Sequence, residues 1–529
     1  MAVHSAETIP AHLLMWRRVR EYAVPPSMIA NATVRRAAGD WAGACAAARI
    51  DVDLDLRAVR HRHGTPLAAL LRDDLRRLAP DLLRWHMPRT APDGRLRPGL
   101  TLTLARYGPP GTGAPHLVVR TPPAWADAGQ RMSLALWEDS HEQPVGHHPH
   151  PHPDRRFRLD LHRHLWDATR GAELARRCGA AGAAPATDAS GPPGDDSARL
   201  PPHWTAEAEL LLRDAGTPRG ALTVRLGTRS RAVLELTAPD DHHAPVLRAL
   251  RTPLPAQRVA VLPVLPEAAV RPLPDLELLR AGLFPSERLH PLVVAALATV
   301  PRTPTGPPPD TGRDHGGGTG HGDGTGDGGR TWDVVGTWQD AGEWHDAGPG
   351  HDAGPVHDPE FAAEATDPHR VPCGGAVHRI ALRDGSLTAV DHEPAELARE
   401  ELLMALGGPG LPCLRAIDDV HRSPEALPAV RDRLGHGDVT GAMAVVEGLL
   451  GPAAVLRDGP LRDVLEAAVA GRLDQGLFRA GLVRRHPATG ITGEHGHRPR
   501  VDRSLPGELR RVLGRRRDSR GRPRTVLRD

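Results

Sequence analysis

The chain has 529 residues, a net charge of +2 and no lysine, because all 67 of its basic side chains are arginine. The missing lysine excludes Schiff-base chemistry, pyridoxal-phosphate anchoring and the lysine-dependent phosphate sites of P-loop enzymes and kinases. The small net charge gives no overall field that would select nucleic acid or membrane, while 40% apolar residues are enough to build hydrophobic cores.

Residues 1–178 predict a mixed α+β module. Helices are expected over 11–49, 66–86 and 159–177, and the alternating pattern predicts strands over 50–56, 100–106, 116–120 and 131–137. A loop rich in His and Pro, 143–154, interrupts this module. Residues 179–203 are mainly Ala, Gly, Pro, Asp and Ser, a composition typical of a linker.

Residues 204–300 predict a second mixed module. Its helices are expected over 205–214, 275–281 and 286–299, and its strands over 220–226, 231–237 and 257–262. Residues 301–371 then predict a disordered Gly-rich linker, because 301–330 offer no apolar side chain but Pro. This linker includes a tandem segment, 332–358, in which Trp, His and Asp recur every six residues.

Residues 372–485 predict a β-hairpin followed by helices. Alternating apolar residues over 376–391 flank Asp384-Gly385, a pair that favours a type I′ turn. The whole pattern is of class α+β, with two mixed modules, a C-terminal hairpin and helical module, and an Arg-rich tail over 486–529.

Two segments share a helix-turn-helix pattern. Gly39-Asp40 and Gly437-Asp438 are each followed by an apolar residue and, further on, by Ala. Glycine can end a helix in the left-handed conformation, and the aspartate that follows can cap the next helix. Each turn resembles the central turn of a tetratricopeptide hairpin, although the 34-residue array of that family is absent. Two ordinary helical hairpins are the simpler expectation.

Three acidic residues, Asp51, Asp53 and Asp55, alternate along a predicted strand and would share one of its faces. Carboxylates so placed can hold Mg²⁺ or Mn²⁺ or act as acid and base, and His61 and His63 would add ligands. This pattern predicts a metal-dependent hydrolase as one alternative. The other is a solvated strand face whose carboxylates pair with arginines.

The histidines and cysteines give a weaker indication of metal binding. His147, His148, His150 and His152 could bind a transition metal, but the prolines between them favour an extended chain that binds metal adventitiously. No two of the four cysteines have a CxxC spacing. Cys373 with His378 could form a nucleophilic pair, whereas a buried structural thiol is the simpler interpretation. No cofactor motif is found.

The tail over 498–529 carries 12 Arg against 4 acidic residues. Arginine binds phosphate well, but no aromatic residue lies between these arginines, so nucleic-acid binding is not favoured. The longest apolar run, 292–300, is much shorter than the roughly 20 residues of a membrane-spanning helix. Together with the lack of a signal-peptide pattern at the N-terminus, this predicts a cytoplasmic protein without membrane partners.

Several longer stretches, 24–57, 102–108, 121–138 and 148–168, resemble an uncharacterised protein family of high-GC Gram-positive, streptomycete-like bacteria. The resemblance implies a setting beside MoxR-type AAA+ ATPases and von Willebrand A-domain proteins, but no activity. The expectation is therefore a non-catalytic cytoplasmic adaptor or scaffold that acts through protein partners as an accessory of such an ATPase system. The alternative is the hydrolase built on Asp51, Asp53 and Asp55.

Overall fold

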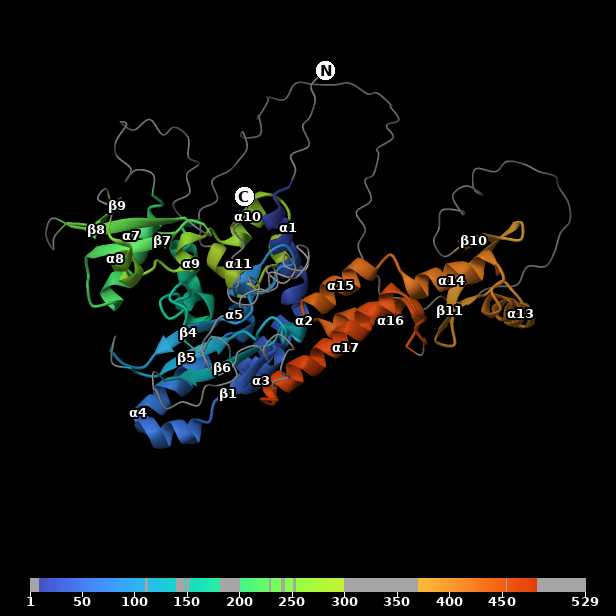
Figure 1. Ribbon diagram of the computed structural model, residues 1–529, viewed down its shortest axis with the longest axis horizontal. Helices are drawn as coiled ribbons and strands as arrows, with labels where there is room; N and C mark the ends of the chain where they lie inside the picture. Colours follow the sequence, from blue (N-terminus) through green and yellow to red (C-terminus); the bar gives the residue numbers. More distant parts are fainter. Residues whose placement is uncertain are drawn as a thin grey trace, which may run out of the picture.

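A computed structural model describes residues 9–109, 113–138, 148, 152–180, 200–227, 230–238, 243–250, 254–298, 370–452 and 454–482 (Figure 1). Of the predicted linker over 301–371, residues 301–369, which include the hexapeptide repeat, lie outside these residues, and so does the predicted tail over 486–529. The last two residues assigned to the linker, Arg370 and Val371, instead begin a β-strand (Arg370–Cys373). The described chain combines helices with several sheets, so the predicted α+β class is confirmed.

The N-terminal domain is built around a four-stranded sheet of order β1-β6-β5-β4. Strand β1 (Ile50–Asp53) runs parallel to β6 (Met132–Trp137), and β5 (His116–Arg120) and β4 (Thr101–Arg106) continue the sheet antiparallel. The predicted strands in this region are thus confirmed, although β1 is shorter than expected because Asp55 caps the next helix.

Helices surround this sheet. They are α1 (Ala11–Arg18), the π-helical turn η1 (Val19–Ala23), α2 (Pro26–Ala37), α3 (Trp41–Ala47), α4 (Leu56–Arg77) and α5 (Pro80–His86). A small hairpin, β2 (Arg89–Thr90) with β3 (Arg95–Leu96), and the 3₁₀ turn η2 (Ala128–Gln130) complete this part. Prolines at the first position of α2 and α5 explain where these helices begin.

The single helix predicted over 159–177 was wrong. The segment instead forms two 3₁₀ turns, η3 (Arg163–Leu165) and η4 (Ala168–Glu173), and a short helix α6 (Leu174–Arg177). The interruption has a local cause, because Asp167 accepts a hydrogen bond from the Thr169 amide at 3.0 Å and the Trp166 carbonyl accepts one from Ala79 at 2.7 Å. These bonds replace the helical pattern.

The second unit contains α7 (His203–Asp214), a three-stranded sheet of β7 (Gly220–Arg225), β8 (Arg231–Thr237) and β9 (Val246–Ala249), and the helices α8 (Ala256–Val261) and α9 (Glu267–Val270). The strand predicted over 257–262 was wrong. It is helix α8, which begins after Pro255 and buries no residue, so its apolar alternation does not mark a sheet face.

The two helices that follow α9 pack into the N-terminal core, although the sequence assigned them to the second module, 204–300. They are α10 (Pro274–Arg280) and α11 (Pro291–Leu297), separated by the 3₁₀ turn η7 (Ser286–Arg288). Leu278 and Val293 are fully buried in the core cluster that also holds Leu71 and Trp85. Figure 1 shows α10 beside α1. Only the segment up to about Val270 packs into the second core.

A buried ion pair fixes this arrangement. The Arg20 guanidinium donates two hydrogen bonds to Asp275, at 2.9 and 2.8 Å, and the Trp85 indole donates a third at 3.1 Å. A second buried polar contact lies nearby, where His290 Nε2 is 3.0 Å from the Asp81 carboxylate and the His290 ring lies beside Trp85. Sequence patterns do not reveal such long-range polar contacts, which explains why the boundary was misplaced.

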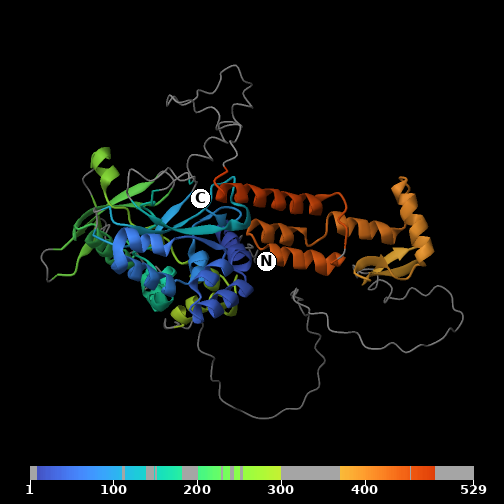
Figure 2. The ribbon, with the colours of Figure 1, turned by 90° about the horizontal axis from the view of Figure 1, so that it is seen from below.

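The C-terminal arm contains β10 (Arg370–Cys373), β11 (Ala376–Arg383) and β12 (Ser386–Ala389), then α13 (Pro394–Ala405), α14 (Pro412–Arg422), α15 (Leu427–Gly435), α16 (Val439–Leu450) and α17 (Pro460–Arg479). The predicted hairpin is confirmed, with positive φ at both Asp384 and Gly385. Figure 2 shows α15–α17 beside the N-terminal domain and the three-stranded sheet at the far end.

The two predicted helix-turn-helix segments form equivalent turns. Gly39 and Gly437 have φ values of +75° and +82°. Each aspartate accepts a hydrogen bond from the backbone amide three residues later, Asp40 at 2.8 Å and Asp438 at 3.2 Å. Each also pairs with an arginine five residues earlier at 2.9 Å. The Gly437 turn packs against η2, so it joins the arm to the N-terminal domain.

Candidate metal centre

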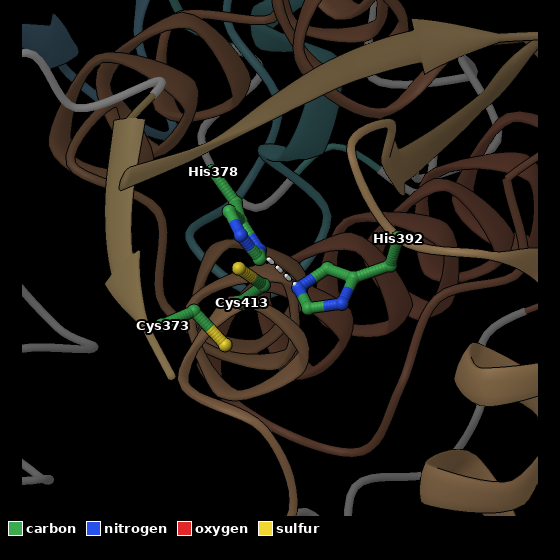
Figure 3. Close-up of side chains that lie close together, drawn as sticks. All are labelled: Cys373, His378, His392 and Cys413. Atoms are coloured by element: carbon green, nitrogen blue, oxygen red, sulfur yellow. Dashed lines mark hydrogen bonds between the residues drawn. The ribbon is translucent and has the colours of Figure 1, made fainter. Parts of the chain in front are cut away.

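Four side chains from separate elements of the C-terminal arm converge at one point (Figure 3). They are Cys373 at the end of β10, His378 on β11, His392 after β12 and Cys413 in the first turn of α14. One ligand atom from each lies within 4.8 Å of the other three. This is the one such group of metal-ligating side chains among the described residues.

The antiparallel pairing explains how the first two residues meet. Cys373 pairs with Ala376 across a turn of two glycines, Gly374 and Gly375, which both have positive φ. His378 lies two residues further along β11, on the same face as Ala376, since side chains alternate along a strand. The tight turn thus brings the thiol and the first imidazole together without any CxxC spacing.

Both thiols are buried, Cys373 with 2% and Cys413 with 0% of its surface exposed. Burial, followed by the interaction with Cys373, raises the pKa of the Cys413 thiol to about 12. A cation that binds here must displace this proton, so its affinity falls as pH falls. The position of Cys413 at the start of an 11-residue helix favours the thiolate once a cation is bound.

The imidazole rings of His378 and His392 approach each other through one nitrogen atom each. His378 Nδ1 lies 2.5 Å from His392 Nε2. The other ring nitrogen of His392, Nδ1, lies 3.2 Å from the Glu396 carboxylate on α13. A proton on Nδ1 that is donated to Glu396 leaves the Nε2 lone pair directed at the cluster. This carboxylate–histidine arrangement is the usual outer-shell support of a metal-bound imidazole.

The donor set fits zinc. Two thiolates and two imidazoles form the Cys₂His₂ set of structural zinc sites. Bond lengths of about 2.0–2.3 Å in a tetrahedron place ligand atoms roughly 3.3–3.8 Å apart, which the observed 4.8 Å limit allows with small side-chain adjustments. Four protein ligands leave no coordination position for water, so such a site serves structure rather than catalysis.

The three aspartates of the hydrolase alternative lie apart from this centre and do not share a cation site. Asp51 pairs with Arg131, Asp53 accepts two hydrogen bonds from Arg479 at 2.6 and 2.7 Å, and Asp55 caps α4 through the amides of residues 57 and 58. The geometry of Asp51 and Asp53 agrees with carboxylates paired with arginine, and the two partners are Arg131, just before β6, and Arg479, at the end of α17.

The nearby histidines do not complete an acidic site. His63 Nε2 lies 2.9 Å from the Glu138 carboxylate rather than beside the three aspartates. Of the His/Pro loop, His147 and His150 lie outside the described residues. His148 is buried with Nε2 2.9 Å from the Thr121 carbonyl, whereas the His152 ring lies 6.0 Å from Trp137. These two described histidines therefore have different surroundings.

Sequence reasoning found two of the four ligands but not the site. The sequence places Cys373 and His378 close together and predicts a structural thiol there, whereas His392 and Cys413 follow only after gaps of 14 and 21 residues, which match no metal-binding spacing. The available signal was the hairpin itself. A Cys and a His precede its turn, a His follows its second strand, and a Cys begins a later helix.

No helix in the described part of the chain is long and apolar enough to cross a membrane. Comparison with protein-family models, with curated proteins and with solved structures gives no match. The family resemblance and the AAA+ ATPase setting therefore stay predictions.

Proposed function

We propose that the protein is a non-catalytic adaptor whose C-terminal arm carries a structural zinc centre and binds a protein partner through helix α13. The convergence of two buried thiols and two imidazoles supports the metal part of this proposal. The adaptor part rests on the exposed surface of α13, which lies next to the centre through Glu396.

The zinc centre accounts for how the end of the arm can fold. Its hydrophobic cluster contains only six buried residues, of which two are the ligands themselves: Cys373, Ile380, Ala389, Cys413, Leu414 and Ile417. So small a core supplies little stability of its own. Metal binding adds free energy directly to folding, because the unfolded chain has no preformed site. The centre therefore holds the hairpin against α14 and fixes the start of α13.

Helix α13 presents apolar side chains to solvent. None of its residues is buried. Leu402 and Leu403 are 62% and 42% exposed, and Leu406, just beyond the end of the helix, is 78% exposed. Three leucines so close together make an apolar patch on the surface of the arm. The helix also carries three Glu and one Arg. Charge complementarity then favours a partner surface with an apolar centre and a basic rim.

The test uses the full-length, zinc-loaded protein as bait in native lysate, followed by cross-linking and mass spectrometry. Changing Leu402 and Leu406 to Asp should abolish capture of the specific partner. Leu473→Asp is the matched control, since Leu473 is 66% exposed on α17. This control should retain the partner, cross-links should fall within 393–406, and salt should weaken the complex because a basic rim is screened.

Two results would refute the proposal. One is a partner that is retained by the Leu402/Leu406 variant as well as by Leu473→Asp. The other is the absence of any captured protein whose cross-links fall within 393–406. Either result would remove α13 as an interaction surface while leaving the zinc measurement to stand separately.

A further inference from the structure

A second feature, far from the zinc centre, is a cavity of about 360 Å³ where the N-terminal core meets α9 of the second unit. Residues of α1, η1, β2, η3, α6 and α10 line it, together with residues of α9 and of the segment between α9 and α10. Its volume is in the range of small-molecule sites, which often occur at such junctions.

Most of the charged groups in this cavity have opposite charges as partners. Arg20 pairs with Asp275, Arg158 with Asp160 and Asp214, Arg177 with Glu207, and Arg271 with Glu267. These pairs compensate their charges within the protein. They leave no need for a ligand at those positions.

Arg89 differs from these four arginines, while Arg97, which also lines the cavity, stacks on Phe157 with its guanidinium carbon 5.7 Å from the ring centre. Its side chain lines the cavity, only 4% of the residue is exposed, and Nη2 donates a hydrogen bond to the Arg84 carbonyl at 2.7 Å. Its Nε and Nη1 have no hydrogen-bond partner among the described residues, and no carboxylate in that part of the chain forms an ion pair with it. Burial and then the charge of Arg20 lower the pKa of Arg89 to about 9, so the guanidinium is still charged near neutral pH.

An unpaired buried guanidinium is costly, and fork-like donors of this kind suit carboxylate and phosphate oxygens. Two further polar atoms line the same cavity, since His86 Nε2 and His164 Nδ1 are buried without a partner among the described residues, and each can donate when its proton is on that nitrogen. The remaining wall is largely apolar and includes Trp16 and Phe157. The cavity thus combines an uncompensated positive group with a surface for an apolar body.

We propose that this cavity binds a small organic oxyanion, with its carboxylate or phosphate group on Arg89 and its aromatic or aliphatic body against Trp16 and Phe157. The apolar wall separates this ligand class from inorganic anions, which would fill only the polar end. Binding would pair the Arg89 guanidinium, which has no carboxylate partner among the described residues.

The test is calorimetric titration of the full-length protein with four probes: phenyl phosphate, 3-phenylpropanoate, the neutral 3-phenylpropanol and inorganic phosphate. At least one organic anion should bind ten-fold or more tightly than both the alcohol and inorganic phosphate. The tighter of the two organic anions identifies the preferred anionic group. Arg89→Gln should reduce its affinity ten-fold or more, whereas Arg213→Gln, which is 65% exposed on α7 outside the cavity, should leave it unchanged.

A structural role for Arg89 would give another pattern. Because Arg89→Gln removes an unpaired buried charge, the melting temperature without probe should be unchanged or higher. The proposal is wrong if neither organic anion binds more tightly than the alcohol, or if folded Arg89→Gln retains the wild-type affinity. Should that variant fail to fold, the comparison of the anions with the alcohol on the wild-type protein decides by itself.

Discussion

The two equivalent turns at Gly39 and Gly437 allow one substitution to be compared in two surroundings. Both glycines have positive φ, so alanine costs about 1–2 kcal/mol at either site. A methyl group at Gly39 meets nothing within 4 Å, whereas one at Gly437 would lie 2.2 Å from the Gly129 carbonyl oxygen. Gly437→Ala must therefore separate the α15–α16 turn from η2, while Gly39→Ala leaves its surroundings in place.

The additional cost at Gly437 follows from the contacts that such a shift weakens. Arg49 donates a hydrogen bond to the His436 carbonyl at 3.0 Å and lies 3.5 Å from the Asp438 carboxylate. A hydrogen bond from a charged donor contributes about 1.5–3 kcal/mol. We expect a total of about 3–5 kcal/mol for Gly437→Ala, against about 1–2 kcal/mol for Gly39→Ala.

Hydrogen exchange measures this difference locally, which matters because a chain with several cores need not unfold in two states. Peptides covering 126–131 and 436–442 should lose protection together in Gly437→Ala. In Gly39→Ala only the peptide around residue 39 should change, and by less. Equal losses of protection in the two variants, each confined to its own turn, would show that the arm does not pack on η2 as described.

Three further perturbations test other parts of the structure. Burial lowers the pKa of His436 to about 4, against about 6.5 when unfolded, so stability that is complete above pH 6.5 should fall by up to about 3 kcal/mol as pH falls toward 4. His436→Gln should flatten this pH dependence in hydrogen exchange of the 436–442 peptide, and an unchanged profile would assign it to other groups. Arg20→Met should cost about 3–5 kcal/mol in denaturant unfolding because it leaves the Asp275 carboxylate buried, and Asp275→Asn in the same chain should recover part of that loss. Calorimetric titration with Mg²⁺ should show no micromolar site, since Asp51 and Asp53 pair with arginine, and a tight site lost in Asp53→Ala would revive the hydrolase alternative.

The parts of the fold that sequence predicted are those with local causes. The hairpin turn at Asp384-Gly385 and the aspartate-capped turns at Asp40 and Asp438 depend on residues within a few positions of one another. Alternating apolar residues likewise identified β4, β5 and β6.

The parts that sequence did not predict depend on contacts between distant residues. The packing of α10 into the first core rests on Arg20 and Asp275, which are 255 residues apart. The proposed zinc ligands come together only because strand β10 pairs with β11. No alternating apolar pattern in the sequence predicted β10. The role proposed for Arg89 depends on its burial and on the absence of a carboxylate partner among the described residues, and neither can be read from the sequence.

The central claim is that Cys373, His378, His392 and Cys413 hold one structural zinc ion. The most direct measurement is the metal content of the full-length protein after dialysis, with Cys413→Ser compared with the matched control Cys45→Ser, a buried cysteine of α3 outside the cluster. The wild type and Cys45→Ser should each retain one zinc per chain, and Cys413→Ser should lose it. A wild-type protein without stoichiometric zinc, or equal retention by Cys413→Ser and Cys45→Ser, would contradict the account.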